Sequence, residues 1–219
     1  MALITSTTPS VNALVARDTV AADLGAYYVS STVPGTGLLG HAVSTTLVET
    51  KAIFLCANTG SATVYPQYLR MTMTALPGGN TQQQFTVVLD QGNRFSAFVA
   101  GNALSTVNVN NGSLNISGAV VAAGAITLTA NTAQRRIIGH RQFRPTVIGV
   151  VGDVYQWSWG SGECVDPSGL PTDGTLRAHI YYNSSPLVIP PGTMMAIHAW
   201  GATFSTGATY EYEFGYVEK

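Results

Sequence analysis

Apolar and polar side chains alternate along much of the chain after residue 25. In residues 68–76, Leu69, Met71 and Met73 fall on one face, while Arg70 and Thr72 fall on the other. A period of two is the pattern of a half-buried β-strand. Residues 47–58 differ, because apolar side chains are continuous from 53 to 56. That run predicts a strand in the interior.

Turn residues separate several further segments of β character. The pattern predicts strands within 84–90, 137–159 and 175–182, and a final hairpin formed by 186–204 and 209–217. Pro145 argues for an edge strand or a strand break within its segment. Short strands at intervals of about 8–12 residues, with turn chemistry between them, are typical of sandwiches, jelly rolls and barrels. We expect an all-β fold, an antiparallel β-sandwich or jelly roll.

Two stretches depart from this pattern. Ser10 could cap a short helix through Val11, Leu14 and Val15. The alternative for residues 1–25 is an extended arm on another element or subunit. We therefore expect an N-terminal arm, extended or partly helical, followed by a β-sandwich domain at 26–219. Residues 101–133 are rich in Asn, Ala and Gly and form either part of that domain or a small-residue β insertion. Strands of small residues specify register weakly, so a partner would help fix them.

The low charge content points to a surface made for contact. Charged residues make up 10% of the chain and the net charge is −1, against about 25% charged residues in an ordinary soluble domain. A free monomer uses charges to stay soluble and to protect its sheet edges. We therefore expect burial of this surface against further copies of the chain and against neighbouring subunits. The alternative is a secreted β-protein with a neutral polar surface.

The densest basic cluster contains Arg135, Arg136, His140, Arg141 and Arg144. Nucleic-acid binding normally needs a broader positive surface, so we expect no nucleic-acid partner. The four arginines are instead a candidate contact with another subunit. The alternatives are a solvated strand face and a patch that faces nucleic acid. The first eight residues lack the features of a signal peptide. No apolar stretch reaches the length that spans a membrane, so we expect no membrane partner.

Three large rings, Tyr155, Trp157 and Trp159, alternate with smaller residues and share one face of a predicted strand. Three interpretations are open. Large rings dominate core packing, but Trp and Tyr are also favoured anchors at the centre of subunit interfaces. The same rings could form a platform for sugar rings. They are therefore the candidate interface or glycan face.

Glu211 and Glu213 are the most enzyme-like pair. Residues i and i+2 of a strand lie about 7 Å apart on one face, which overlaps the carboxylate separation of inverting glycosidases. However, every second residue from Tyr210 to Tyr216 is aromatic. An aromatic core face with a charged outer face explains the whole segment. We expect no catalytic residue here and no enzyme.

The remaining candidates for chemistry are weak. The four histidines are scattered without ligand spacing on one element, and His198 is interpreted as a hydrogen-bonded packing residue. The loop 160–174 carries Glu163, Asp166 and Asp173 and could hold calcium through oxygen ligands, but Asp and Pro are also ordinary turn residues. We expect no cofactor and no metal.

The C-terminal pattern carries a family resemblance. In residues 187–200, Pro191-Gly192 leads into a long alternating strand, and an aromatic strand follows at 210–217. This arrangement resembles the late hairpin of virion β-sandwich proteins. The neutral surface and the N-terminus without a signal are similar to tailed-bacteriophage structural proteins, above all capsid cement or decoration proteins.

The resemblance implies a set of expectations. It implies jelly-roll-like dimers or trimers that lie across junctions between major capsid protein subunits in the virion, are assembled in the host cytoplasm and catalyse nothing. The alternative is a receptor-binding or tail-fibre domain that recognises host glycans through Tyr155, Trp157 and Trp159, exposed beside the loop 160–174. A third class is a carbohydrate-active enzyme that uses Glu211 and Glu213.

Overall fold

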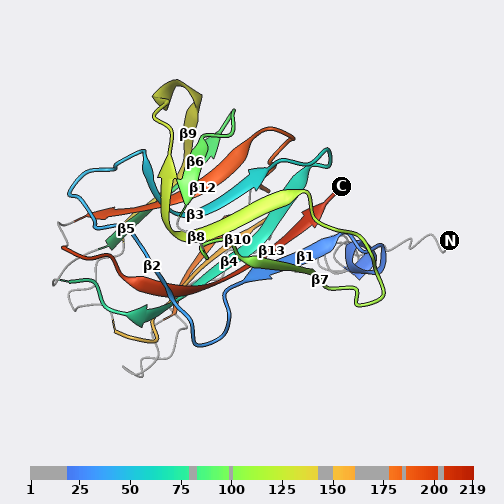
Figure 1. The fold of residues 1–219 in the computed structure, drawn as a ribbon, viewed down its shortest axis with the longest axis horizontal. Helices are drawn as coiled ribbons and strands as arrows, with labels where there is room; N and C mark the ends of the chain where they lie inside the picture. The colour runs from blue at the N-terminus through green and yellow to red at the C-terminus, as the bar shows by residue number, and fades with distance from the viewer. Residues whose placement is uncertain are drawn as a thin grey trace.

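The computed structural model describes residues 19–78, 83–98, 101–142, 150–160, 178–183, 186–201 and 205–219. These residues form two β-sheets packed against each other (Figure 1). A short helix at residues 19–23 lies beside the C-terminal end of the chain. Residues 1–18, which include most of the expected arm, lie outside the described part. So do Pro145 and the loop proposed for calcium beyond residue 160.

The first sheet has seven strands in the order β11-β10-β4-β13-β1-β7, with β2 paired to β13. The second has six strands in the order β6-β8-β3-β12-β5-β9. The described pairs are antiparallel except for β10 with β11. The strands of the first sheet are β1 (Tyr27–Ser31), β2 (Leu38–Leu39), β4 (Val64–Ala75), β7 (Ser105–Asn108), β10 (Val154–Trp159), β11 (Ala178–Asn183) and β13 (Thr209–Glu218). Those of the second are β3 (Lys51–Asn58), β5 (Gln83–Asp90), β6 (Phe95–Phe98), β8 (Ala119–Leu128), β9 (Arg135–Gln142) and β12 (Met194–Gly201).

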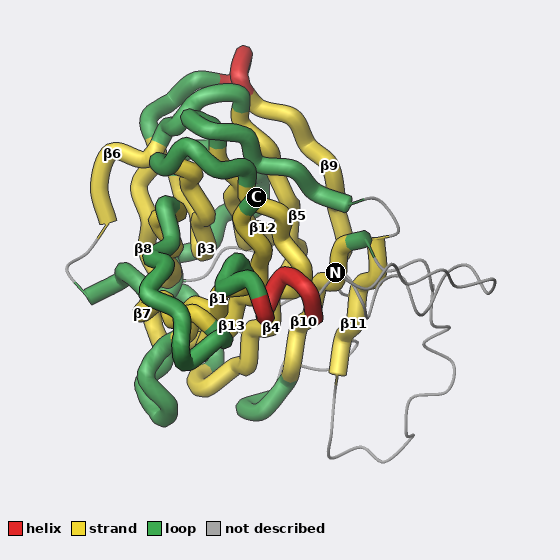
Figure 2. The backbone as a smooth tube through the Cα atoms, turned by 90° about the vertical axis from the view of Figure 1, so that its right-hand side faces the viewer, coloured by secondary structure: helices red, strands yellow, loops and turns green. Residues whose placement is uncertain are grey.

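Eight of these strands have jelly-roll connectivity. The antiparallel pairs β1·β13, β3·β12, β4·β10 and β5·β9 make one long ribbon, in which β1 to β5 run outward and β9 to β13 return. Wrapping that ribbon places β13 beside β4 and β12 beside β5. The result is β1-β13-β4-β10 opposite β3-β12-β5-β9, which is the two-sheet jelly roll. Figure 2 shows the two sheets as separate layers.

Residues 101–133 take part in both sheets. Within this stretch β7 pairs with β1 of the first sheet, and β8 pairs with β3 of the second. The stretch is therefore an insertion only relative to the eight jelly-roll strands, since it falls between β5 and β9. β8 carries an extra residue opposite Ile53, at a register shift between Ala52 and Phe54. Gly124, with φ +86°, supplies the backbone conformation that this bulge needs.

Alternation along β4 and β13 of the first sheet builds much of the core. Leu69, Met71 and Met73 of β4 are buried, as the period of two predicted. The aromatic face of β13 is buried too, and ring pairs such as Phe54 with Phe214, 5.0 Å between centroids, join the two sheets. Edge-to-face pairs of this kind add to the stability that area burial provides.

The central strands of the second sheet are buried on both faces. In β3, Phe54 and Cys56 belong to the core between the sheets, whereas Leu55 and Ala57 belong to a second apolar cluster. Because neighbouring residues of a strand point to opposite faces, the second cluster lies on the outer face of this sheet. Phe95 of β6 packs against it. Burial on both faces explains why the run 53–56 is continuously apolar.

Candidate assembly surface

The three aromatic residues of β10 lie in the core. Tyr155, Trp157 and Trp159 are 3%, 2% and 3% exposed. Phe85, from the opposite sheet, lies 5.1 Å from the ring of Tyr155 and 5.5 Å from that of Trp157, measured between centroids. Rings buried between two sheets of one chain cannot reach a partner or a sugar. The expectation of an interface or glycan face is therefore corrected, and the core interpretation holds.

Glu211 and Glu213 lie on the outer face of β13 and are bonded to groups of their own chain. Glu213 accepts hydrogen bonds from the Tyr68 hydroxyl, at 2.7 Å, and from the Arg70 guanidinium. Glu211 accepts one from the backbone N–H of Gly35 at 2.7 Å. The division of this strand into an aromatic inner face and a charged outer face is thus confirmed.

Three of the four arginines, Arg135, Arg136 and Arg141, fall in β9, the edge strand of the second sheet. Arg135 is partly buried, and its guanidinium lies 3.9 Å from the Glu49 carboxylate. Arg136 is exposed and donates to the carbonyl oxygens of Ala133 and Arg135, both at 3.1 Å. The side chain of Arg141 and the whole of Arg144 lie outside the described part. The contact between these arginines and another subunit stays a prediction.

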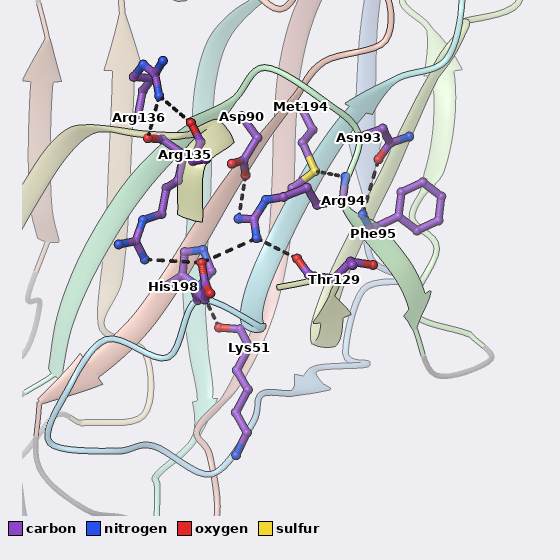
Figure 3. Close-up of polar contacts among 12 residues, drawn as sticks. Lys51, Asp90, Asn93, Arg94, Phe95, Thr129, Arg135, Arg136, Met194 and His198 are labelled. Atoms are coloured by element: carbon purple, nitrogen blue, oxygen red, sulfur yellow. Dashed lines mark hydrogen bonds and ion pairs between the residues drawn. The ribbon is translucent and has the colours of Figure 1, made fainter. Parts of the chain in front are cut away.

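A buried charged network connects the end of β5 with β8 (Figure 3). Arg94 is 3% exposed, and it donates to Asp90 Oδ2 at 2.9 Å and to the Thr129 carbonyl at 2.8 Å. Its guanidinium lies 3.9 Å from Glu49, which is equally far from Arg135. The network therefore holds together three loops that are distant in sequence. Buried charges need such pairing because they lose their hydration.

His198 of β12 lies beside this network (Figure 3). Its ring is fully buried, and Nδ1 is 2.8 Å from the carbonyl oxygen of Lys51. Nε2 has no hydrogen-bond partner among the described residues. Burial lowers the pKa of His198 to about 4, and the Lys51 carbonyl opposes that shift. Arg94 and Arg135 lower this pKa further, while Asp90 raises it. The packing role predicted for His198 is confirmed.

This histidine makes the stability of the fold dependent on pH. Its pKa is about 4 in the folded chain and 6.5 ordinarily, so the unfolded chain binds the extra proton between those values. Neutral His198 therefore makes its full contribution to the free energy of unfolding above pH 6.5. This contribution, about 3 kcal/mol, is lost as the pH drops towards 4.

Urea unfolding at pH 7 and at pH 4.5 measures this loss. Carboxylates also titrate at low pH, so the matched control is His198→Asn. Its amide can donate to the Lys51 carbonyl but cannot bind a proton. We expect a smaller loss of stability in the variant than in the wild type. Equal losses would show that His198 is not the responsible group.

The most exposed apolar side chains lie in the loop at residues 109–118, between β7 and β8. Leu114 is 95% exposed and Ile116 is 90% exposed. We call this segment the β7–β8 loop. Single exposed apolar residues are common at protein surfaces, but contiguous apolar patches mark contact sites. Their surroundings therefore decide how these two residues are interpreted.

The β7–β8 loop is fixed to the end of the N-terminal helix by asparagine side chains. Asn108 and Asn115 donate to the carbonyl oxygen of Gly25, at 2.8 and 3.1 Å. Asn110 donates to that of Asp23 at 3.0 Å. Gly25 has φ +65°, and an added Cβ would collide with Ser113 of the loop. The loop is thus held in place while the side chains of Leu114 and Ile116 point into solvent.

An apolar groove lies beside this loop. It has a volume of about 530 Å³, and Val20, Leu24 and Ala26 form one wall, with Tyr65 and Val217 opposite. Leu24 is 71% exposed, so the groove opens directly to solvent. Groove and loop meet at Leu24, whose carbonyl oxygen lies 3.4 Å from Asn115 Nδ2. Together they form one surface, which we call the loop–groove surface.

Sequence reasoning did not find the loop–groove surface. It singled out residues 101–133 as a stretch that a partner would stabilise, but it did not propose Leu114 or Ile116 as contact residues. The signal was present, since two large aliphatic residues in a segment of Asn, Gly and Ser have no neighbours to bury them. The groove could not be predicted, because its walls come from residues about 40 to 200 positions apart.

Neither a family model, nor a curated protein, nor a solved structure matches the chain. In the part of the chain that the structure describes, no helix has both the length and the apolar character to cross a membrane.

Proposed function

We propose that the chain is a non-enzymatic structural subunit of a virus particle, with capsid cement or decoration as its specific role. The observation that carries the proposal is the jelly-roll order, β1-β13-β4-β10 opposite β3-β12-β5-β9. This architecture occurs in viral capsid proteins, in lectin domains and in cupins. The choice among these classes rests on what the interior and the surface of this chain contain.

The interior favours a building block over a ligand-binding domain. Aromatic rings such as Phe54, Phe85 and Phe214 fill the space between the sheets. The apolar groups free to make contacts lie outside, at Leu114 and Ile116. The receptor-binding alternative depended on exposed rings on β10, and those rings are buried. Burial of these rings therefore removes the feature that supported the receptor-binding alternative.

The physical role of such a subunit is to oppose separation of its neighbours. A standard protein interface buries about 1,600 Å² in total. Many weak copies joined in one shell bind with an avidity far above that of a single contact. With 10% charged residues, the chain loses little charge hydration when its surface is covered. Cement built this way stabilises a shell without chemistry.

The decisive experiment locates the chain in the particle of the virus that encodes it. A cryo-EM map of purified particles should contain its jelly roll at junctions between major capsid proteins. Particles stripped of the chain should release their genome at a lower temperature, and adding the purified chain back should reverse the shift. Purified particles that lack the chain would contradict the proposal. A shell built from this chain itself would contradict only the cement role.

A further inference from the structure

We infer that two copies of the chain pair through the loop–groove surface, with Leu114 and Ile116 of each copy in the groove of the other. This inference rests on the proposed function, because it names the first neighbour that the subunit contacts. The partner is a second copy of the chain, and aliphatic side chains form the contact.

The groove fits these side chains in size and chemistry. A cavity of about 150 Å³ lined by aliphatic residues holds a benzene-sized group. The groove of about 530 Å³ therefore admits both an isoleucine and a leucine side chain. Its walls are mostly aliphatic, and the charged residues Glu218 and Lys219 also border it. Asn111, an exposed residue of the loop, provides a polar side chain that suits such a rim.

The placement of loop and groove favours a second copy as the occupant. Leu114 and Ile116 are almost fully exposed, so they do not fill the groove of their own chain. Leu24 belongs to the groove wall and lies next to the loop. A two-fold axis near Leu24 would place each loop over the partner's groove, so that both contacts form at once. Such a self-complementary contact closes into a dimer, the commonest symmetric assembly.

The loop is suited to this contact because it is already fixed. Asn108, Asn110 and Asn115 hold its backbone against residues 23–25. Pairing therefore does not have to order a flexible segment, and ordering of that kind normally weakens binding. At the far end of the loop, the Glu218 carboxylate accepts hydrogen bonds from the backbone N–H groups of Gly118 and Ala119. Both ends of the loop are thus anchored.

The first test changes the loop and leaves the fold intact. We expect the full chain to dimerise in sedimentation equilibrium. The double variant Leu114→Asp/Ile116→Asp should dimerise about 100-fold more weakly, because it carries charges into an apolar groove. Val33→Asp is the matched control, since Val33 is 68% exposed and lies outside the loop–groove surface. It should dimerise like the wild type, and circular dichroism should show the same fold for all three chains.

The second test asks whether loop and groove meet each other. Leu24→Asp damages the groove and keeps the loop. A mixture of Leu24→Asp with the loop variant restores one intact loop facing one intact groove. We expect the mixed pair to form more tightly than either variant alone. A mixture no better than the separate variants would overturn the inference.

Other results would also decide against it. A wild-type chain that stays monomeric at about 100 μM would overturn it, and so would a loop variant that dimerises like the wild type. If deleting residues 1–18 were needed to produce dimers, the chain's own N-terminal segment would be the occupant. Failure of the inference is separable from failure of the proposed function. A dimer absent from particles refutes only the function, and a particle-bound monomer refutes only the pairing.

Discussion

Phe85→Ala is expected to lower the free energy of unfolding by about 4 kcal/mol, the range seen when a buried aromatic residue becomes alanine. Phe85 is 1% exposed and extends from β5 towards the first sheet. Its ring packs against Tyr155, Trp157 and Tyr210, the last at 6.4 Å between centroids. The substitution removes these contacts and leaves a cavity at the centre of the jelly roll.

Urea unfolding followed by tryptophan fluorescence measures this loss, since Trp157 lies next to the altered site. Phe85→Leu is the matched control. It keeps an apolar group in the same space, so it should cost less than half as much. A loss below about 1 kcal/mol for Phe85→Ala would mean that the surrounding rings close the cavity, and that the core is less tightly packed than the ring distances indicate.

The fold class was predictable because β-strand periodicity is a local property of the sequence. Alternation at Leu69, Met71 and Met73 and along 210–216 identified buried faces correctly. Hydrophobic periodicity also showed that Tyr155, Trp157 and Trp159 share a face. It could not tell a core face from an interface, because both are apolar. Only the position of Phe85 across the sandwich decides that question.

The topology and the loop–groove surface were less accessible from the sequence. The pairing of β10 with β11 is parallel, which no local pattern indicates. The exposure of Leu114 depends on asparagine bonds to residues 23–25, more than 80 positions away along the chain. Long-range pairings of this kind follow from the fold as a whole. Residue types within the segment do not encode them.

The buried charge network also depends on long-range contacts that the local sequence does not indicate, and it affects the stability of the fold. Arg94 follows Asp90 by four residues, in a segment that reads as an ordinary turn. Burial of the pair arises because the turn is packed against Thr129 and Met194, whose Sδ is 3.1 Å from the backbone nitrogen of Arg94. The outer face of the second sheet is thus closed partly by charged groups. Their pairing determines whether it stays closed.

Arg94→Met is expected to cost about 3–5 kcal/mol, because it leaves the buried Asp90 carboxylate without its cation. The double variant Asp90→Asn/Arg94→Met removes both charges. We expect it to be less destabilised than the sum of the two single variants, since neither charge is then left uncompensated. Urea unfolding of the wild type, both single variants and the double variant gives this coupling directly.

Arg136→Met is the matched control for this cycle. It removes an arginine from β9, which pairs with β5 in the second sheet, but Arg136 is exposed and bonds mainly to nearby carbonyl oxygens. Its cost should therefore stay within about 0.5 kcal/mol. If the Asp90 and Arg94 substitutions proved additive, the two side chains would contribute independently. The contact of the Arg94 backbone with Met194, rather than the charge pairing of its side chain, would then close the outer face.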